Sequence, residues 1–177
     1  MPDVRLMTTD QAPPDLLAAV RALCDRAFTG GFDDHDWQHA LGGWHAVVLD
    51  GADVVAHAAV VPRELHVAER PWQAGYVEAV ATDPARQGRG HGRLAMAEIG
   101  AVVRRDYELG ALATGAHGFY ERMGWERWRG PTYVRRGPEL VRSADEDDGV
   151  MVLRQGPSQA LDLTDAISCP GRAGDDW

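Results

Sequence analysis

Residues 76–103 constrain the fold of this chain more than any other segment. An apolar strand at residues 76–81 leads into the loop Gln87-Gly88-Arg89-Gly90-His91-Gly92, and a helix follows. Glycines at a helix start allow several backbone N–H groups to point at one place, where the helix dipole also favours an anion. We therefore predict that this loop binds phosphate.

The loop differs from the two best-known nucleotide-binding patterns. It lacks the Gly-Lys-Ser/Thr ending of a P-loop, and no acidic ribose partner follows about twenty residues later, as a dinucleotide site requires. The helix after the loop is amphipathic, and we expect it to pack on a sheet. Its apolar face comprises Ala95, Ile99, Val102 and Val103, and its charged face comprises Arg93, Arg104 and Glu108.

The rest of the chain reads as one α/β domain over residues 1–177, a length that can bury a sizeable core. The predicted strands are residues 4–7, 45–49, 54–67, 73–82, 109–113 and 150–153, and further helices are predicted at residues 13–28 and 34–41. The Pro- and Gly-rich segment 130–138 and the acidic run before Gly149 are predicted to be loops. Beyond Gly156 the sequence has little periodicity.

The formal net charge of −9 argues against a nucleic-acid partner, because binding a phosphate backbone requires a basic surface. It suits a cationic substrate better. The acidic residues gather in three places: Asp33, Asp34 and Asp36; residues 145–148; and Asp175 with Asp176. Each group alone can be a solvated loop or a helix cap, whereas the three together could converge on a polycation.

No apolar run approaches the roughly eighteen residues that a membrane helix needs, and residues 1–10 contain no hydrophobic signal region. We therefore expect a cytoplasmic protein without a membrane partner. Cys24 and Cys169 lie far apart and lack the spacing of metal ligands, so we interpret both as ordinary thiols.

His35 and His39 stand four residues apart, as the two zinc ligands of a zincin helix do. Asp36 follows the first histidine, but it is one methylene shorter than the glutamate that acts as general base in such helices. No third ligand has suitable spacing. We interpret the pair as part of a surface helix and predict no metal site.

Glu78 is the acidic residue of an otherwise apolar strand. Alternation places it on one face with Tyr76, Val80 and Thr82, unless a bulge resets the register. A buried carboxylate is unfavourable unless it has a partner or a task. Two interpretations stay open: a base that removes a proton from an ammonium group, and a carboxylate paired with a cation at the mouth of the sheet.

Two motifs resemble those of the GNAT N-acetyltransferases. Gln87, Gly90 and Gly92 match the Q/R-x-x-G-x-G/A pattern of the GNAT pyrophosphate loop. Residues 118–125, Gly-Phe-Tyr-Glu-Arg-Met-Gly-Trp, are similar to the F-Y-x-x-x-G-F/W signature that comes later in that fold. The resemblance implies an α/β GNAT fold, with a mixed central sheet, a splayed pair of strands and flanking helices, and acetyl-CoA as cofactor.

The same resemblance implies roles for individual residues. The GNAT strand that matches residues 76–82 carries a bulge and binds pantetheine and the thioester carbonyl, so the Val80 N–H is the implied oxyanion donor. Tyr120 matches the tyrosine that protonates the departing thiolate; the alternative is an aromatic residue packed in the core. The implied acetyl-CoA contacts are Val80, Thr82, Gln87, Gly88, Arg89, Gly90, His91 and Gly92.

A closer resemblance covers nearly the whole chain. Residues 36–43, 56–60, 75–78, 109–112, 147–149 and 172–177 are similar to blocks of the aminoglycoside 2'-N-acetyltransferases. That family acetylates the 2'-amine of aminoglycoside antibiotics with acetyl-CoA, and its members form homodimers. The resemblance implies direct attack of the amine in a ternary complex, with Glu78 as a water-relayed base. Two alternatives stay open: acetylation of another amino sugar, such as a cell-wall precursor, and a non-catalytic module that binds acetyl-CoA or an aminoglycoside.

Substrate contacts are also implied by this resemblance. They are Asp33, Asp36, Glu78, Ala79, Ala113, Asp147, Asp175 and Trp177, the last through the terminal carboxylate and with its indole docked. The chain departs from the family at two places. Gly31 stands where an acidic residue is expected, and a segment two residues shorter before Tyr120 leaves Ala113 or Thr114 in place of a serine.

Overall fold

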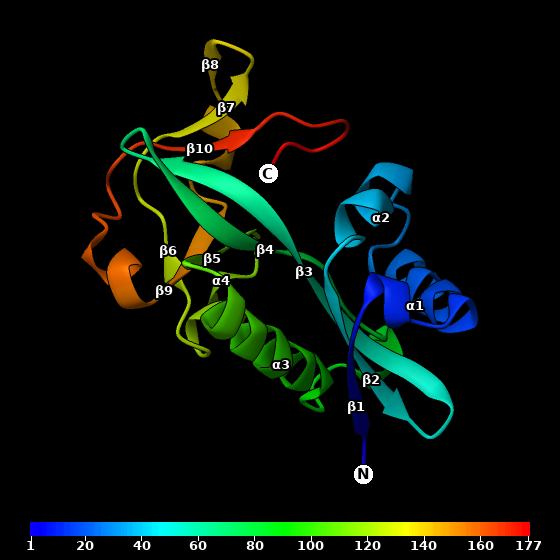
Figure 1. Ribbon diagram of the computed structural model, residues 1–177. Helices are drawn as coiled ribbons and strands as arrows, with labels where there is room; N and C mark the ends of the chain where they lie inside the picture. The colour runs from blue at the N-terminus through cyan, green and yellow to red at the C-terminus, as the bar shows by residue number, and fades with distance from the viewer. The chain divides into compact units, whose positions relative to one another are not determined.

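The computed structural model describes residues Met1–Trp177 and divides into two compact units (Figure 1). Unit 1 comprises Met1–Val61 and Val77–Val102, and unit 2 comprises Pro62–Tyr76 and Val103–Trp177. Strands β3 (Asp53–Val67) and β4 (Arg70–Thr82) and helix α3 (His91–Asp106) each have residues in both units. The chain therefore passes from one unit to the other within regular secondary structure, without a loop linker.

Unit 1 contains an antiparallel arrangement of strands, with two helices between the first strand and the second. β2 (Trp44–Asp50) pairs antiparallel with β1 (Asp3–Thr8) and with β3. Between β1 and β2 the chain forms the 3₁₀ turn η1 (Thr9–Gln11) and the helices α1 (Pro14–Ala27) and α2 (Asp34–Ala40). The helices and strands predicted here are confirmed, with ends that differ by a few residues.

The core of unit 1 forms where α1 packs against β2, and the partly buried Leu16 and Trp37 lie against it. The apolar residues of α1 recur at helical spacing, which turns them all to one face. Truncating the fully buried Leu23 to Ala would cost about 2–5 kcal/mol. The buried cluster comprises Val20, Leu23, Cys24, Val47, Leu49, Val54 and Ala81.

Unit 2 contains strands in the order β6-β9-β5-β4-β3-β10-β7-β8. β4 is parallel to β5 and β10 is parallel to β7, whereas β9 is antiparallel to both β5 and β6. The strands new to this unit are β5 (Leu109–Ala113), β6 (Glu126–Arg127), β7 (Thr132–Arg136), β8 (Glu139–Arg142), β9 (Val150–Arg154) and β10 (Ile167–Pro170). This mixed sheet with flanking helices confirms the predicted fold class.

The parallel pairing of β4 with β5 runs from Ala74↔Leu109 to Tyr76↔Ala111. Such a short pairing agrees with the predicted splayed pair of strands. After β5 the chain forms the short helix α4 (His117–Glu121), and the 3₁₀ turns η3 (Ala144–Glu146) and η4 (Gly156–Ala160) flank β9.

The structure corrects the prediction of a loop at residues 130–138. β7 and β8 form an antiparallel hairpin there, and its turn is Gly137-Pro138, with Gly137 at φ +58°. Gly130 precedes β7 and admits no side chain, since a Cβ would lie 1.9 Å from the carbonyl oxygen of Asp165. The Pro and Gly residues therefore mark the two ends of a strand.

β6 and β10 were not predicted either. β10 has the sequence Ile-Ser-Cys-Pro, which is too short to show a period. It pairs with β3 and β7, which lie much earlier in the chain. Pairing with strands distant in the sequence therefore specifies β10, and its own local sequence pattern does not.

α3 buries the apolar face that its sequence predicts and exposes Arg93 and Arg104. At its C-terminus the Gln155 side-chain amide donates to the carbonyl oxygens of Val103, at 2.9 Å, and Tyr107. Helix ends leave carbonyl groups without intrahelical partners. Gln155 supplies a donor to the Tyr107 carbonyl and a second donor to the Val103 carbonyl, which also accepts from the Tyr107 N–H. No helix of the structure has the length and hydrophobicity needed to cross a bilayer.

Candidate active site

The loop after β4 starts from a fixed point in unit 1. Asp83 caps the 3₁₀ turn η2 (Pro84–Arg86), because its Oδ1 accepts from the Ala85 N–H at 2.9 Å. The Arg86 guanidinium donates to the carboxylates of Asp50, at 2.5 Å, and Asp53, at 2.8 Å. These two ion pairs tie the turn to the β2–β3 hairpin, so the next residues leave from a defined position.

Two glycines direct the backbone of this loop. Gly88 has φ +76° and Gly90 has φ +83°, and a Cβ at either position would meet nothing within 4 Å. A side chain would therefore find room at both positions, and it is the left-handed backbone that favours glycine there. α3 begins at His91, so its first N–H groups lack intrahelical partners and can bind a diphosphate together with the dipole of this 16-residue helix.

The strand before the loop departs from extended geometry at Ala79. Ala79 has φ +50°, a left-handed conformation that a residue with a Cβ rarely adopts. The departure lies where the GNAT resemblance implies a bulge. Glu78 and Val80 stand on either side of it, and both side chains are half-buried.

Asp33 and Asp36 form the N-terminal cap of α2. Asp33 Oδ1 accepts from the N–H groups of His35, at 2.8 Å, and Asp36, at 3.0 Å, and Asp36 Oδ2 accepts from the Asp33 N–H at 2.9 Å. The Asp36 N–H is the largest cause that holds the pKa of Asp33 below its ordinary value. The helix-cap interpretation of this acidic group is therefore correct, and each cap uses one carboxylate oxygen.

Tyr120 lies on α4 in unit 2 and is 7% exposed. Its ring packs edge-on against Phe119, with centroids 4.9 Å apart. Burial raises the pKa of Tyr120 to about 12, although a hydrogen bond with the Thr114 side chain acts in the opposite direction. Thr114 directly follows Ala113, the last residue of β5, so the shortened segment still places a hydroxyl group beside Tyr120.

Two of the three acidic groups come together in unit 2. Burial raises the pKa of Glu146 above its ordinary value, and the carboxylates of Asp175, Asp145 and Asp176 raise it further. Four acidic residues from two segments far apart in sequence therefore share one negative field. Such a field attracts cations.

Asp147 contributes differently from its acidic neighbours. Its carboxylate forms a two-oxygen ion pair with Arg142, and its Oδ1 accepts from the N–H and the hydroxyl of Thr132, each at 3.0 Å. The Arg142 guanidinium is the largest cause that holds the pKa of Asp147 far below its ordinary value. A drug contact at Asp147 would therefore use a carboxylate that already holds η3 to the β7–β8 hairpin.

The last residues of the chain are docked on unit 2. Trp177 is 6% exposed, and its indole N–H donates to Ser143 Oγ at 3.1 Å, as predicted for the indole. Asp176 accepts from Arg136 at 2.6 Å, from the Arg172 N–H at 2.9 Å, from Arg63 at 2.8 Å and from Cys169 Sγ at 3.2 Å. Asp175 directly precedes Asp176, and its side chain is exposed.

Neither thiol has the properties of a nucleophile. Cys24 and Cys169 are buried and free, and burial raises their pKa values to about 12 and about 11. No group of three or more His, Cys, Asp or Glu side chains is placed to hold a metal ion. His35 is exposed on α2.

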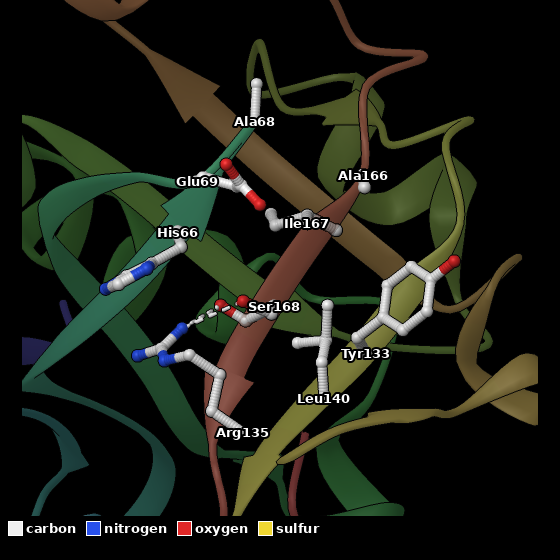
Figure 2. Close-up of a pocket in the computed structure, with 9 residues that line it drawn as sticks. All are labelled: His66, Ala68, Glu69, Tyr133, Arg135, Leu140, Ala166, Ile167 and Ser168. Carbon is white, nitrogen blue, oxygen red and sulfur yellow. Dashed lines mark hydrogen bonds between the residues drawn. The ribbon is translucent and has the colours of Figure 1, made fainter. Parts of the chain in front are cut away.

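Unit 2 also has a surface pocket of about 440 Å³ that contains none of the predicted site residues (Figure 2). Its walls come from the turn between β3 and β4 and from β7, β8 and β10. Arg135 crosses one side and donates to the carbonyl and hydroxyl oxygens of Ser168, each at 2.9 Å. Tyr133 and Leu140 supply apolar surface, and Leu140 belongs to the last strand of the sheet.

Sequence reasoning missed two features of the site. His45 and His57 are fully buried in unit 1, and His57 contacts the Ala79 carbonyl oxygen at 2.8 Å. Histidines inside otherwise apolar strands were the available signal. The second feature was the hydrogen bond between Thr114 and Tyr120, since the sequence left Ala113 and Thr114 as alternatives at this position.

The comparisons with known proteins agree with this geometry. Residues 9–128 match the family model of the acetyltransferase (GNAT) domain. The chain is 38% identical over 177 residues to an aminoglycoside 2'-N-acetyltransferase of Mycolicibacterium fortuitum, and the alignment covers 98% of this chain and 91% of that protein.

Two solved structures show the same fold. Escherichia coli YhbS in complex with CoA has a TM-score of 0.68 at 18% identity, covering 95% of this chain and 89% of that one. A GNAT family acetyltransferase from Brucella melitensis in complex with acetyl-CoA has a TM-score of 0.62 at 18% identity, covering 93% and 94%. The fold, the family model and the full-length relative agree, and the chain belongs to the GNAT acetyltransferases and, among them, to the aminoglycoside 2'-N-acetyltransferase family.

Proposed function

We propose that this chain transfers the acetyl group of acetyl-CoA to the 2'-amine of an aminoglycoside. The observation that carries the proposal is that one chain combines a glycine turn at the N-terminus of a helix in unit 1 with a shared negative field in unit 2. The first suits a nucleotide-linked donor and the second suits a polycationic acceptor. The full-length relative named as an aminoglycoside 2'-N-acetyltransferase supports the same substrate class.

The residues of unit 1 fit acetyl-CoA. Gly88 and Gly90 leave their backbone uncovered, and the N-terminus of α3 favours the negative charge of a diphosphate. When bound, acetyl-CoA supplies an acetyl group activated as a thioester. The proposed contacts to it are Val80, Thr82, Gln87, Gly88, Arg89, Gly90, His91 and Gly92.

We assign the Val80 N–H as donor to the carbonyl oxygen on which negative charge develops. A preorganised donor of this kind contributes about 10²–10³-fold in rate, because it requires no reorganisation during the reaction. The left-handed residue before it, Ala79, sets its direction.

Two side chains handle the protons. We assign Glu78 as the base that takes a proton from the 2'-ammonium group through a water molecule. Tyr120 is the acid that protonates the departing thiolate, and its pKa of about 12 keeps the phenol protonated at neutral pH. The amine attacks directly in a ternary complex, and neither buried thiol takes part.

The acceptor is held mainly by carboxylates. The proposed contacts are Asp33, Asp36, Glu78, Ala79, Ala113, Asp147, Asp175 and Trp177. Asp175 is the clearest of them, because its side chain is exposed and it lies in the shared negative field around Glu146. Ammonium groups of the drug would reduce the repulsion among these carboxylates, which favours binding.

Thiol release from acetyl-CoA tests the proposal. Two matched aminoglycosides are compared, one with a 2'-amine and one with a 2'-hydroxyl. We expect release only with the 2'-amine, and acetylation at that nitrogen by mass spectrometry. Thiol release only with other amino sugars would assign the enzyme a different substrate class. Binding of acetyl-CoA without thiol release in the presence of any amine would mean that the chain is a binding module.

We further propose that the protein is a cytoplasmic homodimer and that residues 1–177 act as one domain. β8 is the last strand of its sheet, and it exposes 55% of Leu140 and 42% of Val141. Its sequence Glu-Leu-Val-Arg is self-complementary. Antiparallel pairing about a two-fold axis would place Glu139 opposite Arg142 of the partner subunit and cover both apolar side chains.

Sedimentation velocity tests the dimer. Val141→Lys places a charge at the centre of the proposed pairing, and we expect it to convert dimer to monomer. Arg70→Lys, an exposed position on β4, serves as control. A wild-type monomer, or a Val141→Lys dimer, would contradict the proposed interface.

A further inference from the structure

A continuous hydrogen-bonded chain crosses the core of unit 1 and ends at Ala79. The Gly42 N–H donates to Thr9 Oγ1 at 2.9 Å, and Thr9 Oγ1 contacts His45 Nε2 at 2.8 Å. His45 Nδ1 lies 3.0 Å from His57 Nε2, and His57 Nδ1 lies 2.8 Å from the Ala79 carbonyl oxygen. The register Val47↔His57 and His45↔Ala59 makes the two histidines diagonal neighbours on one face of β2 and β3.

The partners fix the direction of every hydrogen bond in this chain. A carbonyl oxygen only accepts, so His57 Nδ1 carries the proton, and the Nε2 of the neutral ring accepts. His45 Nδ1 therefore donates to His57, and His45 Nε2 accepts from the Thr9 hydroxyl. All the bonds run one way, from the Gly42 N–H to the Ala79 carbonyl.

The arrangement requires that both imidazoles stay neutral. Both rings are fully buried, and burial is the largest cause that lowers the pKa of His45 to about 4 and that of His57 to about 3. In these tautomers a further proton on His57 would lie on Nε2 and face the His45 Nδ1–H, and a further proton on His45 would lie on Nε2 and face the Thr9 hydroxyl. The pair is therefore a fixed relay of hydrogen bonds at neutral pH.

The last carbonyl belongs to the same peptide unit as the Val80 N–H. A trans peptide unit is planar, so its C=O and N–H point in opposite directions. When His57 fixes the Ala79 oxygen, it also fixes the line along which the next N–H donates. Because neighbouring hydrogen bonds polarise each other, donation to this C=O strengthens the N–H as a donor.

We propose that His57 is a positioning residue that aims the Val80 N–H at the thioester carbonyl, with His45 and Thr9 holding it in place. The proposal rests on the proposed function, since that assigns the N–H its role. It explains why Ala79 stays at φ +50° although it has a Cβ: an interaction buried in the core holds its carbonyl turned inward.

The first test compares His57→Leu with His57→Gln. Leucine has similar bulk but no donor, whereas the amide of glutamine can donate to Ala79 and accept from His45. We expect His57→Leu to lower kcat about 10–100-fold with the KM values for both substrates changed less than about twofold, because an interaction made in the transition state is weakened. We expect His57→Gln to restore most of kcat. His66→Gln changes a half-buried histidine of unit 2 and is the control.

A second variant and a second measurement keep the test independent of folding and of activity. Thr9→Val breaks the far end of the relay at a half-buried site, and we expect kcat to fall about 2–5-fold. The ¹⁵N and ¹H shifts of the Val80 amide, measured without ligand in valine-labelled protein, should move in His57→Leu and Thr9→Val and return towards wild type in His57→Gln.

Two results would overturn the relay. One is a Val80 amide signal that does not move in His57→Leu or in Thr9→Val, and the other is a fall in kcat that equals the fall in the fraction of folded protein. The outcomes separate this inference from the proposed function. If the wild-type protein acetylates no amine but the Val80 signal responds as expected, the relay stands and the proposed function fails. If the wild-type protein acetylates the 2'-amine but the Val80 signal is unmoved in the variants, the proposed function stands and the relay fails.

Discussion

The β4–α3 turn of unit 1 and the acidic end of unit 2 are built by different forces. The turn directs main-chain N–H groups through backbone angles at Ala79, Gly88 and Gly90, and its side-chain ion pairs lie at its base. The acidic end consists of carboxylates that repel one another around Glu146. A backbone site keeps its charge at every pH, whereas a carboxylate site changes with pH and salt.

Because of this difference, the backbone site suits the acetyl donor and the carboxylate site suits the acceptor. The donor always carries the same diphosphate, which a fixed set of N–H groups can bind. Aminoglycosides vary in the number and position of their ammonium groups, and a diffuse negative field can attract all of them.

The largest effect is expected at the chemical step. Glu78→Gln keeps the shape of the side chain and removes the base, so kcat should fall about 10²–10⁴-fold while acetyl-CoA binding is retained. The loss should be greatest at low pH, where neutral amine is scarcest. The pH dependence of kcat/KM measures this, and an unchanged profile would remove Glu78 from the mechanism.

The second effect isolates the backbone site. Gly90→Val forces a β-branched residue into φ +83°, which costs about 1–2 kcal/mol, so acetyl-CoA should bind about 5–30-fold more weakly by calorimetry. Aminoglycoside binding should be unchanged.

Gly30→Val is the matched control for this variant, since Gly30 has φ +84° and open space around it but belongs to the segment between α1 and α2. We expect it to lose stability without losing acetyl-CoA affinity. Equal weakening by both substitutions would show that the loop glycines serve folding alone.

The third effect isolates the carboxylate site. Asp175→Asn should raise the KM for the aminoglycoside about fivefold at low salt and leave the KM for acetyl-CoA unchanged, because one partly screened charge contributes about 1 kcal/mol. The difference should shrink as ionic strength rises. Asp148→Asn removes an exposed charge from the acidic run at residues 145–148 and should have less effect. Equal effects of the two substitutions would mean that only net charge matters.

The smallest effect concerns stability. The folded-state pKa of Asp147 lies below its unfolded value, so its ion pair stabilises the fold above about pH 4, and that stability is lost as pH falls through the folded-state pKa. After discounting for solvent screening, Asp147→Asn should cost about 1 kcal/mol, or a Tm lower by about 2–4 °C at pH 7. The Tm difference between variant and wild type should shrink in acid. A difference that is constant with pH would contradict the ionic origin.

Local pattern predicted most of the fold because most elements here carry their own signals. α1 and α3 show helical periodicity, and β5 is a short apolar run with clear ends. β10 and the β7–β8 hairpin were missed, because the first depends on distant partners and the second is bounded by residues that also mark loops.

The candidate site divides in the same way. The loop glycines follow from sequence, since left-handed angles select glycine. The left-handed Ala79 does not, because alanine gives no such signal and the cause lies in His57, on another strand. The ion pair between Asp147 and Arg142 was equally hidden, since it joins η3 to a hairpin that the sequence did not reveal.

The open space around Gly88 and Gly90 has a consequence for mutational scanning. A library of variants selected only for solubility should accept asparagine at both positions, because asparagine tolerates left-handed angles and finds room there. A library selected for survival on an antibiotic should accept glycine alone. The difference between the two libraries would measure how much of a glycine's constraint comes from its ligand rather than from its fold.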